Sequence, residues 1–135
     1  MVHSKILFVS SIYMFIGNFP FIFLYYTSYY SALPSNYSDL PIYYSILPSY
    51  YLLGLSTSIL NHGFNSRILQ ILDRTVMAIG SIVDMYYIND IEEMELLMLS
   101  IVNYFMAKIT HQVFFHVVSH FTITILHNRI LMHNF

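Results

Sequence analysis

Two pairs of polar residues in this chain have the spacing at which side chains share one face of a helix. His116 and His120 are four positions apart, as are Ser58 and His62. Residues at i and i+4 are neighbours on a helix surface, so the imidazoles of the first pair can bind one metal ion. His62 can supply a third nitrogen, and three His ligands with an open fourth position are the ligand set of a catalytic zinc site.

A carboxylate, Asp73, lies between the two pairs. Bound zinc lowers the pKa of a coordinated water towards neutrality, which generates hydroxide for attack on a carbonyl. Asp73 can accept the proton of that water or orient a ligand imidazole. Each motif alone is weak, because pairs at this spacing arise by chance in a chain with seven His. Their order and the intervening carboxylate make the combination more specific.

Long apolar runs must position these residues. Hydrophobic residues make up 57% of the chain and charged residues 9%, whereas a soluble domain carries about 25% charged residues. A soluble protein this poor in charge cannot cover its surface, whereas a bilayer favours an apolar outer surface. Backbone groups cannot stay unpaired in hydrocarbon, so the runs are predicted to be helices. They span residues 6–30, 41–62, 68–88, 94–109 and 112–130.

We therefore predict an all-α fold, a multi-pass transmembrane bundle of about five helices in which residues 1–135 form a single domain. The fourth and fifth runs are short, so bundles of three or four crossings are alternatives. The first run can also be a cleaved signal peptide, although it exceeds the usual apolar length of about 7–15 residues. The charged stretch of residues 90–95 is expected to be a loop.

The direction of the helices should gather the polar residues at one membrane face. If successive helices alternate in direction, the end of the second and the starts of the third and fifth lie on the same side. Lys and Arg favour the cytosolic side. With the N-terminus inside, all cations except Arg129 fall at inner helix ends: Lys5, Arg67, Arg74 and Lys108. The N-terminus and the metal site are thus predicted on the cytosolic side.

Each site residue also has an ordinary structural interpretation. A His at a membrane interface often only extends its polar tip towards water. Asp73 can pair with the adjacent Arg74, and Ser58 can bond a carbonyl of its own helix. His111 can replace one of the three ligands, although a loop position constrains it less.

Three further ionisable residues receive no catalytic role. Asp84 follows Asp73 by eleven positions, about 16 Å further along the helix, and is expected to approach the acidic loop. His127 and His133 fall towards the far end of the last helix and are interpreted as surface or terminal residues.

The polar positions together resemble a known family pattern. Ser58-Ile-Leu-Asn-His62, then Asp73, then His116-Val-Val-Ser-His120 is similar to the signature of the CREST superfamily of membrane hydrolases. That superfamily includes the alkaline ceramidases, the progestin and adipoQ receptors and the Per1-like proteins. The resemblance implies zinc ligation by the three His, action of Asp73 on the zinc-bound water, and Ser58 beside the metal. The implied reaction is hydrolysis of a lipid amide such as ceramide.

The chain is shorter than the family pattern requires. The interval between His62 and His116 leaves room for one intermediate crossing, fewer than the family has. A reduced enzyme, a degenerate relative and a homo-oligomer that completes its own pocket are the alternatives that follow.

A second hypothesis comes from a different class of protein. The chain can be a non-catalytic small multi-pass membrane protein, viral or organellar, that assembles or reshapes membranes; a receptor-like role is a third alternative. These hypotheses predict no metal and tolerance of substitution at His116 and His120. A net charge of −2 gives no basic surface for nucleic acid, so membrane lipids are the expected partners. Convergence of the three His nitrogens favours the zinc enzyme.

Overall fold

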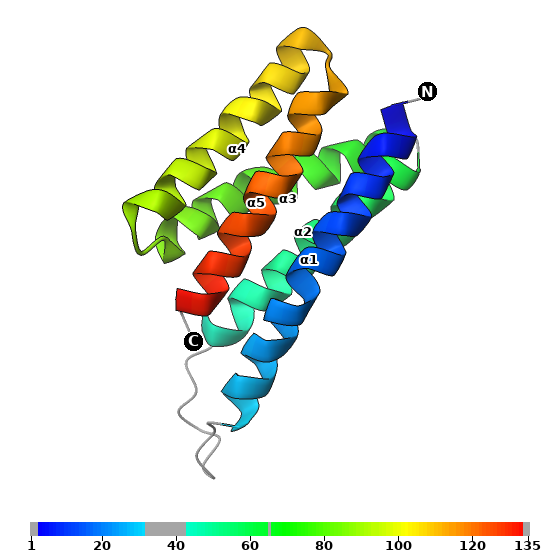
Figure 1. Cartoon of the computed structure of the whole chain (residues 1–135). Coiled ribbons are helices and arrows are strands. Elements are labelled where there is room, and N and C mark those ends of the chain that lie inside the picture. The colour runs from blue at the N-terminus through cyan, green and yellow to red at the C-terminus, as the bar shows by residue number, and fades with distance from the viewer. Residues whose placement is uncertain (1–2, 32–42, 65, 134–135) are drawn as a thin grey trace.

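The computed structural model describes residues 3–31, 43–64 and 66–133 and contains five α-helices and no strand within these ranges (Figure 1). The predicted all-α class and the number of helices are confirmed. The helices are α1 (His3–Ser31), α2 (Tyr43–Gly63), α3 (Arg67–Tyr87), α4 (Ile91–Thr110) and α5 (Val113–His133).

Helices that follow one another in the chain run antiparallel, whereas α1 and α5 run parallel (Figure 1). α4 packs along α5, α1 packs on both α2 and α5, and α3 packs mainly on α2. Figure 1 shows the start of α1 and the α4–α5 connection at the same end of the molecule. The core that joins the helices is apolar and includes Ile22, Leu47, Tyr51, Leu97 and Leu126. α1 is therefore an integral part of the packing.

The start of α4 differs from the expected boundary. Asp90 caps the helix, because its Oδ1 accepts a hydrogen bond from the backbone N–H of Glu93 (2.8 Å). That hydrogen bond holds the pKa of the Asp90 carboxyl below its ordinary value. The Oε2 of Glu93 in turn accepts from the backbone N–H of Asn89 (2.7 Å). The expected loop of residues 90–95 is therefore wrong, since residues 91–95 form the first turns of α4.

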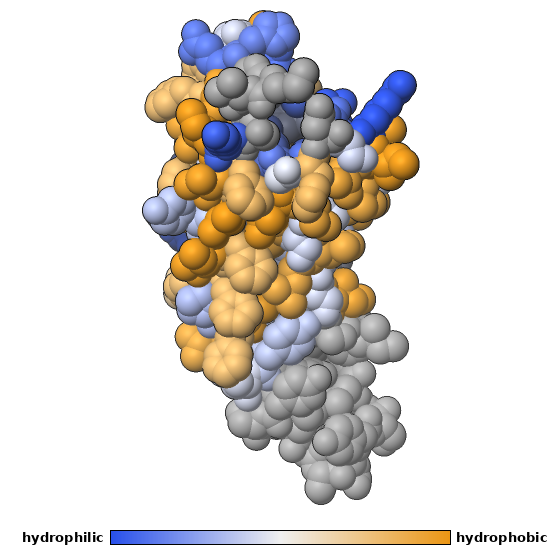
Figure 2. Space-filling view, turned by 90° about the vertical axis from the view of Figure 1, so that its right-hand side faces the viewer, coloured by the Kyte–Doolittle hydropathy of each residue, from blue (hydrophilic) through white to orange (hydrophobic). Residues whose placement is uncertain are grey.

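α3 places carboxylates inside and apolar side chains outside. Its buried residues are Asp73, Val76, Gly80 and Asp84. Its exposed surface carries large apolar side chains: Ile68, Ile71, Leu72, Ile79, Ile82 and Met85. A helix of a water-soluble bundle has the reverse arrangement, with its apolar stripe on the core. Figure 2 shows one face of the molecule that is mostly apolar through its middle and polar towards one end.

Among the described helices, α1 alone is long and apolar enough to cross a membrane, over Lys5–Ser28. A buried core helix or a signal sequence meets the same requirement as α1. Several crossings therefore remain a prediction.

Candidate metal centre

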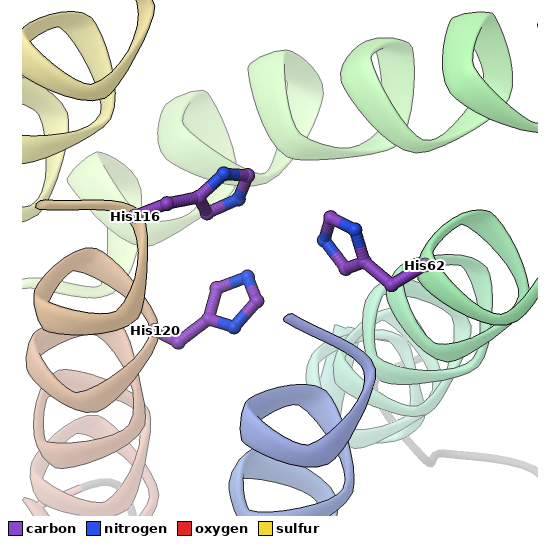
Figure 3. A group of neighbouring side chains, drawn as sticks. All are labelled: His62, His116 and His120. Atoms are coloured by element: carbon purple, nitrogen blue, oxygen red, sulfur yellow. The ribbon is translucent and has the colours of Figure 1, made fainter. Parts of the chain in front are cut away.

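Three His side chains from two helices meet near the end of the bundle that holds the α4–α5 connection. One ring nitrogen from each of His62, His116 and His120 lies within 4.8 Å of the other two. Figure 3 shows the rings turned towards a common space between α2 and α5. His62 lies in the last turn of α2, whereas the other two lie one turn apart on α5. The structure thus brings together the three residues predicted as ligands.

The ring nitrogens of this group suit a metal ion. The Nε2 atoms of His62 and His116 are buried and have no hydrogen-bond partner among the described residues. Buried polar atoms rarely lack a partner, so two such atoms side by side call for a ligand. Zinc–nitrogen bonds of ~2.0–2.1 Å place tetrahedral ligand atoms about 3.4 Å apart. Three imidazoles with nitrogens within 4.8 Å of one another, two of them unpartnered among the described residues, are a donor set that fits zinc.

The third ring is held by α1. Ser10 Oγ donates a hydrogen bond to the carbonyl of Leu7 (2.9 Å) and lies 2.9 Å from His120 Nδ1. With the Ser10 proton on the Leu7 carbonyl, Ser10 Oγ accepts from the Nδ1–H tautomer of His120, and this tautomer leaves the Nε2 lone pair for a metal. Sequence reasoning missed Ser10, since a lone serine in an apolar helix is most simply explained by a bond to its own backbone.

Asp73 is buried beside two of the three His. Its Oδ2 accepts a hydrogen bond from Asn61 Nδ2 (2.7 Å), while its Oδ1 is buried and has no partner among the described residues. The alternative pairing with Arg74 is not among the ion pairs of the described residues. Asp73, His62 and His116 line one cavity of about 490 Å³. The free carboxylate oxygen can therefore accept a proton there.

Ser58 does not line the cavity that holds Asp73. It borders a second, mainly apolar cavity of about 270 Å³ together with His120. Its Oγ lies 3.1 Å from the Oγ of Ser11 on α1. Arg74 and Tyr104 line both cavities, so the two cavities are neighbours. The predicted site residues thus divide between two adjacent spaces, with the imidazoles at their junction.

A second polar group lies deeper in the bundle. Asp84 is 1% exposed, accepts a hydrogen bond from the Tyr51 hydroxyl (3.0 Å), and lies 3.2 Å from His127 Nε2. The Tyr51 and His127 rings stack with their centroids 3.8 Å apart. The expectations of an interfacial Asp84 and a surface His127 are therefore wrong. The sequence spacing could have indicated that His127 is buried, since it follows His120 by seven positions and therefore lies on nearly the same face of α5.

A third group at the far end of the bundle is explained by ion pairs. Ligand atoms of Asp90, Glu93 and His133 also lie within 4.8 Å of one another. However, Arg129 pairs with Asp90 (3.1 Å) and with Glu92 (2.6 Å), and His133 Nδ1 lies 2.7 Å from Glu93 Oε1. Because the Arg129 guanidinium pairs with Asp90 and the His133 ring lies against Glu93, the group of His62, His116 and His120 is the stronger metal candidate.

Comparison with known proteins does not identify the chain. No family model matches it, and searches of curated proteins and of solved structures also give no match. The resemblance to the CREST superfamily therefore stays a prediction that rests on the five polar positions.

Proposed function

We propose that this protein is a zinc-dependent hydrolase of lipid amide bonds, a shortened relative of the CREST hydrolases. The observation that carries this proposal is the convergence of three imidazoles, two of which have buried nitrogens without a partner among the described residues. Zinc held by His62, His116 and His120 would supply a Lewis acid that polarises a carbonyl and acidifies water.

The protein's own residues move the protons of this reaction. The Oδ1 of Asp73 accepts a proton from the attacking water as the water oxygen bonds to the carbonyl carbon. It then returns that proton to the nitrogen as the carbon–nitrogen bond breaks, which yields a fatty acid and an amine. Asn61 donates to the other carboxylate oxygen and so fixes the direction in which the free oxygen points.

The apolar cavity supports a lipid substrate. It borders His120, residues of all five helices line it, and its walls include Met14, Leu55 and Leu97. An apolar chain that occupies this cavity leaves water and buries its surface against these side chains. A carbonyl at the end of such a chain then lies next to the imidazoles.

The surface supports a multi-pass membrane protein. Apolar side chains face outwards on α3 while Asp73 and Asp84 face inwards, and this arrangement is stable where lipid replaces water. Arg129, the cation that departs from the expected orientation, is neutralised by two carboxylates. We therefore propose that the N-terminus and the imidazoles lie towards the cytosol.

Metal analysis tests the ligand set. Chain purified in detergent should contain about one zinc per chain, and His116→Asn should lose most of it. His111→Asn is the matched control, because His111 lines the same cavity and its left-handed backbone (φ 56°) suits Asn. Less than stoichiometric zinc in the unsubstituted protein would remove the metal and favour the non-catalytic membrane protein.

The role of Asp73 is tested separately. Asp73→Asn should keep the zinc and lose hydrolysis of a fluorescent fatty-acyl amide, because the amide cannot accept the water proton. Unchanged hydrolysis in this variant would exclude Asp73 as the base.

A further inference from the structure

Two cations from different helices border the cavity that holds His62 and His116. Arg74 projects from α3 and Lys108 from α4, and both line this cavity of about 490 Å³. Tyr104 stands next to both of them: Lys108 Nζ lies 5.0 Å from its ring centroid, and Arg74 interacts with its hydroxyl. The two positive charges are therefore held near one another at the cavity wall.

Neither cation forms an ion pair within the described part of the chain. The carboxylate pairs there involve Arg129, His127 and His133. Among the described residues, Asp73 is the one acidic residue on the cavity wall; its Oδ2 bonds to Asn61 and its Oδ1 has no hydrogen-bond partner there. The two exposed cations repel one another, and Asp73 is the described carboxylate that lies near both. A further anion between them would give each cation a second opposite charge.

The remaining cavity wall also suits an anion. The other polar side chains that line it are neutral hydrogen-bond donors, or can be: Asn61, Gln70, His111 and Gln112. A guanidinium binds two oxygens of a phosphate at once, and an ammonium adds a point charge. The wall thus offers a phosphate both charge and hydrogen bonds.

We propose that this cavity binds the phosphate group of a lipid, with the lipid chain in the neighbouring apolar cavity. If the protein is the proposed hydrolase, on which this reading rests, its substrate carries an anionic head group beside the bond that is cut. Arg74 and Tyr104 line both cavities, so one molecule can place its phosphate in the first and its apolar chain in the second, of about 270 Å³. A free phosphate uses only the first.

Equilibrium binding in an uncharged detergent tests this proposal. Fluorescent phosphatidic acid should bind the intact chain, and fluorescent diacylglycerol, which lacks the phosphate, should bind at least about tenfold more weakly. The double variant Arg74→Gln, Lys108→Gln should weaken phosphatidic acid binding by about tenfold or more. Arg74→Lys should retain part of the affinity, because it keeps the charge and loses the second hydrogen bond.

A charge-matched variant separates this site from general surface attraction. Lys5→Gln, Arg67→Gln removes two cations from the same end of the bundle, and neither residue lines the cavity. This variant should bind phosphatidic acid as the intact chain does, and an equal loss in both double variants would overturn the proposal. Displacement of the lipid by an equal concentration of inorganic phosphate would also overturn the proposal, since the acyl chains of the lipid would then add nothing to the binding affinity.

Zinc content measured on the same preparations distinguishes this inference from the proposed function. Phosphatidic acid binding that depends on Arg74 and Lys108 without zinc upholds the lipid site and overturns the hydrolase. Stoichiometric zinc with no preference for phosphatidic acid over diacylglycerol upholds the metal site of the proposed hydrolase and overturns the lipid phosphate site.

Discussion

Ser10 Oγ and His120 Nδ1 lie 2.9 Å apart although 110 positions separate the two residues along the chain. The contact joins α1 to α5 at the point where α5 supplies one of its two converging imidazoles. Partners of this kind fix the tautomer and the ring orientation of a ligand. α1 therefore takes part in the geometry of the candidate site while contributing none of its imidazoles.

Removing this contact should weaken metal binding. Ser10→Ala is expected to lower zinc affinity by about 10–100-fold, because His120 loses the acceptor that holds its Nδ1–H. Ser11→Ala is the control, since Ser11 is also buried and also bonds the Leu7 carbonyl, but its other contact is Ser58 and not His120. Competition with a chromophoric chelator measures both affinities. Equal losses in the two variants would mean that α1 packing, and not the Ser10 hydroxyl, matters.

The buried Asp84 should matter for stability. Asp84→Ala leaves the Tyr51 hydroxyl and the His127 ring without their partner, and each loss costs about 1–3 kcal/mol. The free energy of unfolding in mixed micelles measures the effect. Ser81→Ala on the same helix should stay within about 0.5 kcal/mol. Adding Tyr51→Phe to Asp84→Ala should cost less than the sum of the single changes, and strict additivity would contradict the contact.

Two helical glycines should respond to alanine in opposite ways. A Cβ at Gly80 would lie 2.9 Å from Tyr50 Cε1, and the Tyr50 hydroxyl is tied to the Val76 carbonyl. Gly80→Ala should therefore destabilise the protein by about 1–3 kcal/mol. A Cβ at Gly54 meets only Val76 Cγ1 at 3.8 Å, so Gly54→Ala should gain up to about 1 kcal/mol of helix propensity.

Melting temperatures in detergent test this pair of glycine variants. A Gly80→Ala protein that melts at or above the temperature of the intact chain would show that the Tyr50 ring is free to move. A Gly54→Ala protein that melts well below it would show that α2 and α3 pack more closely than 3.8 Å at this point.

The spacing of residues along an α-helix made much of the candidate site predictable from the sequence. Spacing of four placed His116 beside His120, and alternating helix direction brought His62 and Asp73 to the same end. The number of helices followed from the lengths of the apolar runs. These features depend on positions within one helix or on the order of helices, which the sequence carries directly.

The remaining features depend on how helices rotate against one another. Which face of α1 meets α5 decides that Ser10 reaches His120, and no local pattern encodes it. The position of Asp84 along α3 indicates only its depth, whereas its partners Tyr51 and His127 come from two other helices. The start of α4 was recoverable, because Asp90 followed by Glu93 has the spacing of a capping residue and its helix partner.

The contact between Ser10 and His120 also means that the candidate centre forms late during synthesis of the chain. α1 emerges first and α5 last, and at about 5–20 residues per second several seconds pass between them. Until α5 is made, Ser10 and His62 lack both imidazoles that α5 supplies, those of His116 and His120. The candidate centre can therefore form only after the final helix has docked on the first, so a nascent chain that stalls before α5 never assembles it.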